Sequence, residues 1–240
     1  MATNDAAGGY TGIDNLEVMA GARNYLRYLN DAIARVAGPP PRAGRLLDFG
    51  AGAGTHTMDM RRRGYDVACA ELDPTLIARL QAEDFDARSG TDGFEPGSFG
   101  LVYTMNVLEH LQDDLEAVQS LRTVLRPGGR LVIYVPAFQV LFSSMDRKVG
   151  HVRRYRRRSL IDLVRTAGFT IDHCAYVDSM GFFTTLAYKA IGSRNGSIDN
   201  RTIAFYDTFI FPVSRVVDRL TGRWFGKNVM LVAHRNQGTN

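Results

Sequence analysis

Short apolar runs alternate with amphipathic stretches between residues 45 and 136, and this alternation limits the possible folds more than any other feature. Strand-like runs are expected at residues 45–49, 66–72, near 86, 99–104 and 130–135. Helix-like stretches separate them at residues 55–63, 74–83 and 113–125. Strands that alternate with helices pack as a mostly parallel sheet with helices on both faces. The pattern therefore predicts an α/β, Rossmann-like fold.

The segments outside this core predict further elements. A helix is expected over 15–37, followed after residue 136 by a helix over 159–167, a strand over 169–177, helices near 182–191 and 203–220, and a last strand over 229–234. Residues 180–226 form a late helical insertion, expected to cap the carboxyl ends of the strands. Residues 1–12 are small, polar and rich in glycine, which predicts disorder. We expect a single domain over 1–240.

Composition limits the environment and the partners of the chain. Its 240 residues, 45% of them hydrophobic, are enough to bury one α/β domain. The sequence has no run of eighteen apolar residues and no signal-peptide pattern, so we expect a cytoplasmic protein without a membrane partner. The net charge is +4, but residues 146–158 carry +6, which leaves −2 elsewhere. One short basic segment does not favour a nucleic-acid partner.

Three alternating glycines follow the first expected strand. Gly50, Gly52 and Gly54 allow a tight turn and close approach of the backbone to a ligand, and the following helix offers free N–H groups. Glu71 ends the second strand, where such folds place a carboxylate on the ribose hydroxyls. The third glycine comes one residue earlier than in the G-x-G-x-x-G of dinucleotide-binding proteins, which disfavours NAD. Asp48, two residues before the first glycine, either positions a cationic amino-acid tail or fixes the turn.

Four motifs in order carry a family resemblance. Residues 46–55 resemble the first motif of class I S-adenosylmethionine-dependent methyltransferases, 70–74 the acidic second motif, 98–102 with 106–110 the fourth strand and its loop, and 125–129 the turn before strand five. The resemblance implies a seven-stranded sheet with an antiparallel last strand, S-adenosylmethionine as methyl donor and S-adenosylhomocysteine as product. It also implies cofactor-binding roles for Asp48, Gly50, Ala51, Gly52, Gly54, Glu71, Leu72 and Asn106, with Leu72 beside the adenine.

The acceptor side requires a base if the acceptor is an alcohol or a phenol. His151 is the first candidate, and His110 and Glu109 are further candidates for catalysis. His151 lies in a Gly-His-x-Arg-Arg-Tyr segment that resembles a branch of small-molecule methyltransferases. A structural alternative stays open: His151 as a loop histidine held by Asp146 or by a backbone carbonyl, and Glu109 and His110 as parts of the pocket floor.

The remaining unusual residues have both structural and functional interpretations. Arg153 and Arg154 are expected to be structural or to line a pocket for an anionic acceptor, whereas residues 156–158 are expected to be a solvated surface. The aromatic residues of 180–226 suit core packing, a homodimer face, or a wall for the acceptor. No Cys/His cluster indicates zinc, and magnesium on Asp146, Glu109 and Asp113 is not demanded by their spacing. No metal site is predicted.

These observations together predict an O-methyltransferase that acts on a small hydroxylated metabolite, such as a sugar or glycoside, with His151 as general base. The alternatives are a phenol, polyketide, quinone or carboxylate acceptor, or a noncatalytic scaffold that only binds the cofactor. The expected partner is a small-molecule acceptor, with neither nucleic acid nor membrane, and a homodimer is left open.

Overall fold

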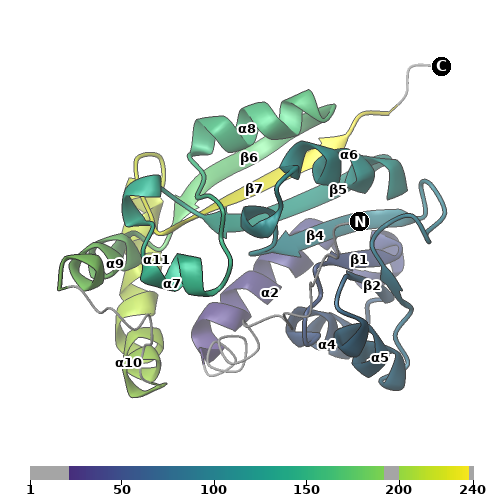
Figure 1. Ribbon diagram of the computed structural model, residues 1–240. Helices are drawn as coiled ribbons and strands as arrows, with labels where there is room; N and C mark the ends of the chain where they lie inside the picture. Colours follow the sequence, from purple (N-terminus) through teal and green to yellow (C-terminus); the bar gives the residue numbers. More distant parts are fainter. Residues whose placement is uncertain (1–21, 192–199, 238–240) are drawn as a thin grey trace, which may run out of the picture.

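The computed structural model describes residues 22–191 and 200–237, which form a seven-stranded sheet covered by helices (Figure 1). The strand order is β3-β2-β1-β4-β5-β7-β6. The strands are β1 (Leu46–Phe49), β2 (Val67–Glu71), β3 (Ala87–Ser89), β4 (Phe99–Met105), β5 (Leu125–Pro136), β6 (Phe169–Val177) and β7 (Asn228–Arg235). The predicted α/β, Rossmann-like fold class with seven strands is confirmed.

Only β7 runs against its neighbours. It pairs antiparallel with β5, where Ile133 faces Leu231, and antiparallel with β6, where Cys174 faces Leu231. The carboxyl ends of the other strands therefore lie at one edge of the sheet. The chain reverses its direction of travel across the sheet between β1 and β4, and ligands of open α/β sheets bind at such a switch point.

Helices cover both faces of the sheet (Figure 1). They are α2 (Arg23–Ala37), α3 (Pro40–Ala43), α4 (Thr55–Arg62), α5 (Pro74–Ala82), α6 (Asp114–Val124), α7 (Ser144–Lys148), α8 (Arg157–Thr166), α9 (Ser179–Ile191), α10 (Asn200–Phe205) and α11 (Phe211–Thr221). Helices α6 and α8 pack on one face of the sheet, and α2 and α4 pack on the other.

Side-chain alternation along the strands explains these two layers. Leu47 points into the core under α6 and α8, while its neighbour Leu46 points into the core under α2. Val102 and Leu101 of β4 divide in the same way. Successive side chains of a strand point to opposite faces, so a strand that is apolar at every position is buried on both sides.

The predicted insertion lies between β6 and β7 and consists of α9, α10, the π-helical turn η3 (Tyr206–Ile210) and α11. It is attached to the first helix through Asp207, whose carboxylate accepts hydrogen bonds from the backbone N–H groups of Asn24 and Tyr25, both at 2.9 Å. Asp207 thus caps the first turn of α2. The predicted disorder of 1–12, the start of the helix predicted over 15–37 and residues 192–199 lie outside the described residues.

The sequence did not predict the short elements α3 and α7 or the 3-10 turns η1 (Leu108–His110) and η2 (Gln139–Leu141). Each has five residues or fewer, too few to show a helical periodicity. Among the described residues, no helix is long and apolar enough to cross a membrane.

Candidate active site

The glycine loop has the backbone that only glycine adopts readily. Gly50, Gly52 and Gly54 all have positive φ, at 77°, 54° and 79°. A Cβ atom on Gly50 would lie 2.3 Å from Cγ2 of Val107, which follows β4. The loop after β1 therefore packs directly on the loop after β4. Gly50 is required there because of its positive φ and because Val107 leaves no room for a side chain.

Glu71 at the end of β2 joins two loops. Its Oε2 accepts a hydrogen bond of 2.7 Å from the N–H of Gly52, and its Oε1 accepts from the N–H groups of Leu72 at 2.7 Å and Asp73 at 3.1 Å. Leu72, the residue expected beside the adenine, has 67% of its surface exposed. The carboxylate and an exposed apolar side chain thus lie together next to the glycine loop.

Asp48, just before the loop, and Ala51, within it, are both buried. Asp48 accepts a 2.6 Å hydrogen bond from the hydroxyl of Thr57 in α4, and burial raises the pKa of Asp48 to about 7. This geometry favours the role that fixes the turn, because the carboxylate holds α4 against β1. Gly54 begins α4, and a Cβ atom there would lie 2.8 Å from Cδ2 of Leu80.

Asn106 ends β4 in a left-handed conformation with a φ of 55°. Its backbone N–H donates to the carbonyl of Tyr134 in β5, at 2.8 Å. The left-handed conformation of Asn106 turns the chain, so that the side chain of the next residue, Val107, packs against Gly50. The structure therefore brings the predicted cofactor residues of three motifs together at the carboxyl edge of β1, β2 and β4.

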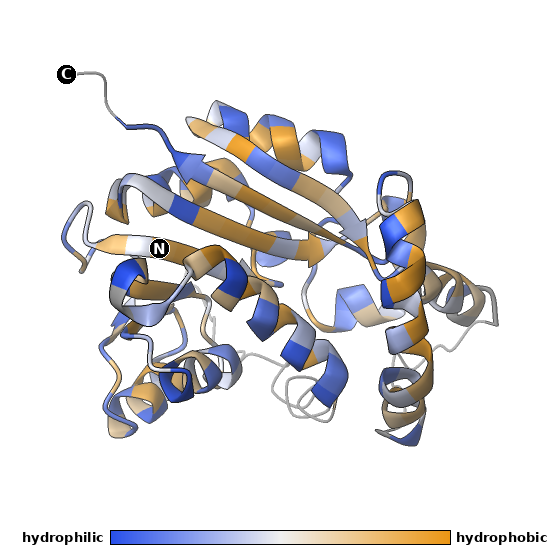
Figure 2. Ribbon diagram, turned by 180° about the vertical axis from the view of Figure 1, so that it is seen from behind, coloured by the Kyte–Doolittle hydropathy of each residue, from blue (hydrophilic) through white to orange (hydrophobic). Residues whose placement is uncertain are grey.

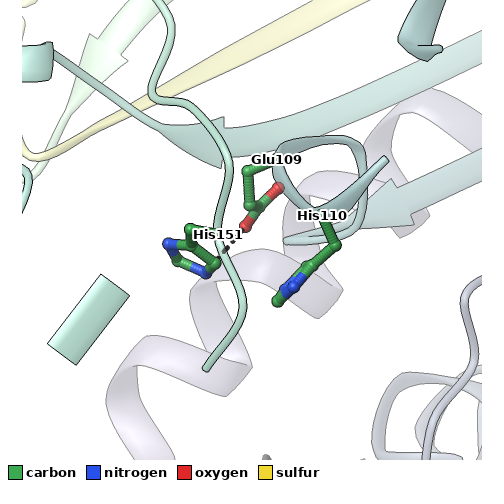
Figure 3. Close-up of side chains that lie close together, drawn as sticks. All are labelled: Glu109, His110 and His151. Atoms are coloured by element: carbon green, nitrogen blue, oxygen red, sulfur yellow. Dashed lines mark ion pairs between the residues drawn. The ribbon is translucent and has the colours of Figure 1, made fainter. Parts of the chain in front are cut away.

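Glu109, His110 and His151, the three candidates for catalysis, form a second group (Figure 3). The rings of His110 and His151 are 4.7 Å apart and nearly perpendicular. Nε2 of His151 lies 3.7 Å from Oε1 of Glu109. The backbone N–H of Val152 donates to the carbonyl of Glu109 at 2.8 Å, which holds the basic segment against η1.

His151 is oriented by Asp146. Its Nδ1 lies 2.7 Å from Oδ1 of Asp146, and Arg154 donates to the same carboxylate from Nε at 2.8 Å. Although burial opposes ionisation, the hydrogen bonds from His151 and Arg154 hold the pKa of Asp146 well below its usual range. An ionised Asp146 can only accept, so Nδ1 of His151 carries the proton and Nε2 of the neutral ring is an acceptor.

Glu109 is fully buried, and neither of its carboxyl oxygens has a hydrogen-bond partner among the described residues. Burial raises the pKa of Glu109 to about 8, so the neutral acid prevails at pH 7. Burial lowers the pKa of His110 to about 4. Ligand atoms of Glu109, His110 and His151 all lie within 4.8 Å of one another, so these three side chains form the group, among the described residues, that could hold a metal ion. The expectation of no metal site stays a prediction.

Three further polar residues have structural partners. His56 pairs with Asn30, with Nδ1 2.7 Å from Oδ1. Asp113 caps α6 by accepting from the N–H of Glu116 at 2.9 Å, so it does not join Asp146 and Glu109. Arg153 forms an ion pair of 2.7 Å with Asp114.

Arg154 is the residue whose role the sequence left most open. Its side chain is only 7% exposed, and it donates to both oxygens of Asp146 and to the carbonyl of Ala137. It therefore supports the active-site segment, as the structural interpretation expected. Asp146, His151 and Arg154 are close in the sequence, and this close spacing could have predicted that their side chains interact.

Comparisons with known proteins agree with this geometry. A family model described as a methyltransferase domain matches residues 21–174. The ubiquinone biosynthesis O-methyltransferase of Xanthomonas campestris pv. campestris is 36% identical over 115 residues, which cover 44% of this chain and 47% of that protein. The chain spans about half the length of the curated relatives it matches.

Two solved structures share the fold. The S-adenosylmethionine-dependent methyltransferase of Archaeoglobus fulgidus aligns with a TM-score of 0.60 and 14% identity, covering 92% of this chain and 99% of that one. The phosphoethanolamine N-methyltransferase 2 of Haemonchus contortus, in complex with S-adenosylmethionine, aligns with a TM-score of 0.62 and 16% identity, covering 98% and 62%. These matches agree with the predicted class I methyltransferase, and the chain belongs to the methyltransferase domain family.

Proposed function

We propose that this protein transfers a methyl group from S-adenosylmethionine to a hydroxyl oxygen of a small metabolite. The observation that carries the proposal is the Asp146–His151 pair, which lies against Glu109 in the segment after β4 and leaves Nε2 of His151 as an acceptor. A histidine oriented by a carboxylate is the arrangement that removes a proton from a hydroxyl group.

The residues at the carboxyl edge fit the proposed cofactor. The glycine loop after β1 carries no side chain at Gly50, Gly52 or Gly54, and Glu71 presents two carboxyl oxygens next to it. These oxygens can accept hydrogen bonds from the ribose hydroxyls, while exposed Leu72 offers an apolar contact to the adenine. When bound, S-adenosylmethionine supplies an electrophilic methyl group on a sulfonium and leaves as S-adenosylhomocysteine.

The chain's own contribution to the reaction is proton transfer and alignment. Nε2 of His151 accepts the proton of the acceptor hydroxyl, and the resulting imidazolium is stabilised by ionised Asp146. Glu109, as a neutral acid, can donate a hydrogen bond to the acceptor without adding a negative charge that would repel the forming alkoxide.

The acceptor is proposed at the level of a hydroxylated metabolite. A sugar or glycoside is the leading acceptor from the sequence. The names of the ubiquinone biosynthesis O-methyltransferases, which match part of this chain, favour a phenolic quinone precursor as the second candidate.

Transfer of labelled methyl groups from S-adenosylmethionine to a panel of sugars, glycosides and catechols tests the proposal. We expect one acceptor class to be methylated on oxygen by the wild type, and His151→Ala to lose turnover while binding S-adenosylhomocysteine with unchanged affinity. Binding of S-adenosylhomocysteine without transfer to any acceptor would favour the noncatalytic scaffold. Full activity of His151→Ala would exclude His151 as the base.

A further inference from the structure

Large apolar side chains are exposed along the inserted helices. Helices α10 and α11 are joined through η3 into one helical rod, because Phe205 and Phe211 at the two junctions keep right-handed helical dihedral angles. The rod stands at the end of the molecule opposite α4 and α5 (Figure 1). We call its exposed large apolar residues, each more than half exposed, the apolar stripe: Phe205, Phe209, Val213, Val216, Leu220 and, in the turn that follows, Trp224.

The members of the apolar stripe are spaced by three or four residues, which places them on one side of the rod. The opposite side faces the protein. There Phe211 packs its ring on Tyr25, and Ser214 accepts a hydrogen bond from the N–H of Met180. The rod is therefore already fixed to the fold through one side, and the apolar stripe is not needed for that attachment.

The exposed charges on the rod are all positive, and its acidic side chains are held against the protein. Every exposed charged residue between 200 and 224 is an arginine, namely Arg201, Arg215, Arg219 and Arg223. The two acids of this segment are used internally: Asp207 caps α2, and Asp218 accepts from the N–H groups of Asp178 and Ser179. Hydrophilic and hydrophobic segments accordingly adjoin along the rod in Figure 2.

We propose that the apolar stripe and its arginines dock on a membrane surface of anionic phospholipids, with the rod lying in the plane of the headgroups. Aromatic and aliphatic side chains beside arginines are the composition of interfacial helices, which insert their apolar side without spanning the bilayer. Anionic headgroups complement the four arginines. A second copy of the chain does not, because two such surfaces would oppose arginine to arginine without an exposed acid between them.

This inference departs from the expectation of no membrane partner, and it replaces the homodimer face with a lipid surface. It is independent of the methyl-transfer proposal, because the apolar stripe shares no residue with the glycine loop or with the Asp146–His151 pair.

Co-sedimentation of the full chain with vesicles tests the inference. We expect binding to vesicles of phosphatidylcholine mixed with phosphatidylglycerol, weakening with added salt, and little binding to phosphatidylcholine alone. The double variant Arg219→Glu/Arg223→Glu should bind the anionic vesicles at least about tenfold more weakly. The double variant Phe209→Ser/Leu220→Ser should also lose binding, since its apolar contacts are removed while its charge is kept.

Matched variants elsewhere control for general effects of charge and hydrophobicity. Arg62→Glu/Arg79→Glu reverses two exposed arginines of α4 and α5, and Val140→Ser removes an exposed apolar side chain. Both should bind as the wild type does. Every variant should retain affinity for S-adenosylhomocysteine, which reports an intact fold.

Three results would overturn the inference. The first is no binding to anionic vesicles, and the second is equal loss in control and stripe variants. The third is a dimer in sedimentation velocity that Phe209→Ser/Leu220→Ser dissociates, because the stripe would then be a protein interface.

Discussion

Nδ1 of His151 lies 2.7 Å from a carboxyl oxygen of Asp146, and both oxygens of that carboxylate also receive hydrogen bonds from Arg154. Asp146→Asn removes the charge that would stabilise the imidazolium but keeps the shape of the side chain. We expect kcat to fall by roughly 10²-fold with unchanged affinity for S-adenosylhomocysteine. Steady-state kinetics and calorimetry measure the two effects, and an unaltered kcat would show that His151 works without this partner.

Glu71 bridges Gly52 and Leu72 through separate carboxyl oxygens. Glu71→Ala should weaken binding of S-adenosylhomocysteine by at least about tenfold, because the proposed acceptor for the ribose hydroxyls is lost and a charged hydrogen bond contributes roughly 1.5–3 kcal/mol. Glu95→Ala, at an exposed acid away from the site, is the control. Equal affinities of the two variants would remove Glu71 from the cofactor site.

Gly50 has no room for a side chain beside Val107. Gly50→Ala should lower the free energy of unfolding by about 2–4 kcal/mol, the sum of a left-handed alanine and an overpacked contact. Val107→Ala removes both Cγ atoms, so Gly50→Ala/Val107→Ala should recover the contact part of that loss. Urea denaturation of the two single variants and the double variant measures the coupling. Additive effects would mean that the contact is not what excludes a side chain at residue 50.

Asp48 makes stability depend on pH in a direction opposite to that of most carboxylates. Burial, only partly offset by the hydrogen bond from Thr57, raises its pKa to about 7, and the ionised form is further disfavoured by Glu71. The folded state then keeps a proton that the unfolded chain releases near pH 4. This stabilisation is complete below about pH 4 and is lost as the pH rises through about 7.

Asp48→Asn should remove that dependence. Between about pH 5 and pH 8, the wild type should lose about 2 kcal/mol more unfolding free energy than the variant does. Urea denaturation at the two pH values gives the comparison, in which all other groups are shared. Parallel losses in both proteins would place the pKa of Asp48 near that of an ordinary carboxyl group.

Glu109, His110 and His151 are close enough to bind a metal ion, yet the proposed reaction needs Nε2 of His151 for a proton. We expect a chelator to leave methyl transfer unchanged, and zinc to inhibit by occupying Nε2. If chelation abolishes the activity and a divalent metal restores it, then the three side chains are a metal site and His151 is not the base.

The layered fold was predictable because its strands and helices have strong local periodicity. Residues 169–177 form the predicted strand, and 55–62 and 74–82 form helices within one residue of their predicted ends. The active-site pairing was less predictable. Asp146 lies in the short helix α7, and His151 follows that helix. His151 contacts Glu109 because two segments 42 residues apart in the sequence cross at the carboxyl edge of the sheet. Such contacts depend on strand order, which local patterns do not specify.

The aromatic residues of the insertion show another limit of the sequence. Phe211 is buried and Phe209 is 60% exposed, although both have helical spacing and similar neighbours. Which of them faces the core depends on where Asp207 attaches the rod to α2, and on the π-helical turn that shifts the following residues around the axis.

The position of β7 between β5 and β6 affects how this chain can fold while it is being made on the ribosome. Residues 125–136 and 169–177 leave the exit tunnel first, but their shared partner strand, residues 228–235, is synthesised later. Until then, β5 has an open edge and β6 has no neighbour in the sheet. The nascent chain therefore carries an unpaired strand that is prone to association until β7 is inserted between β5 and β6.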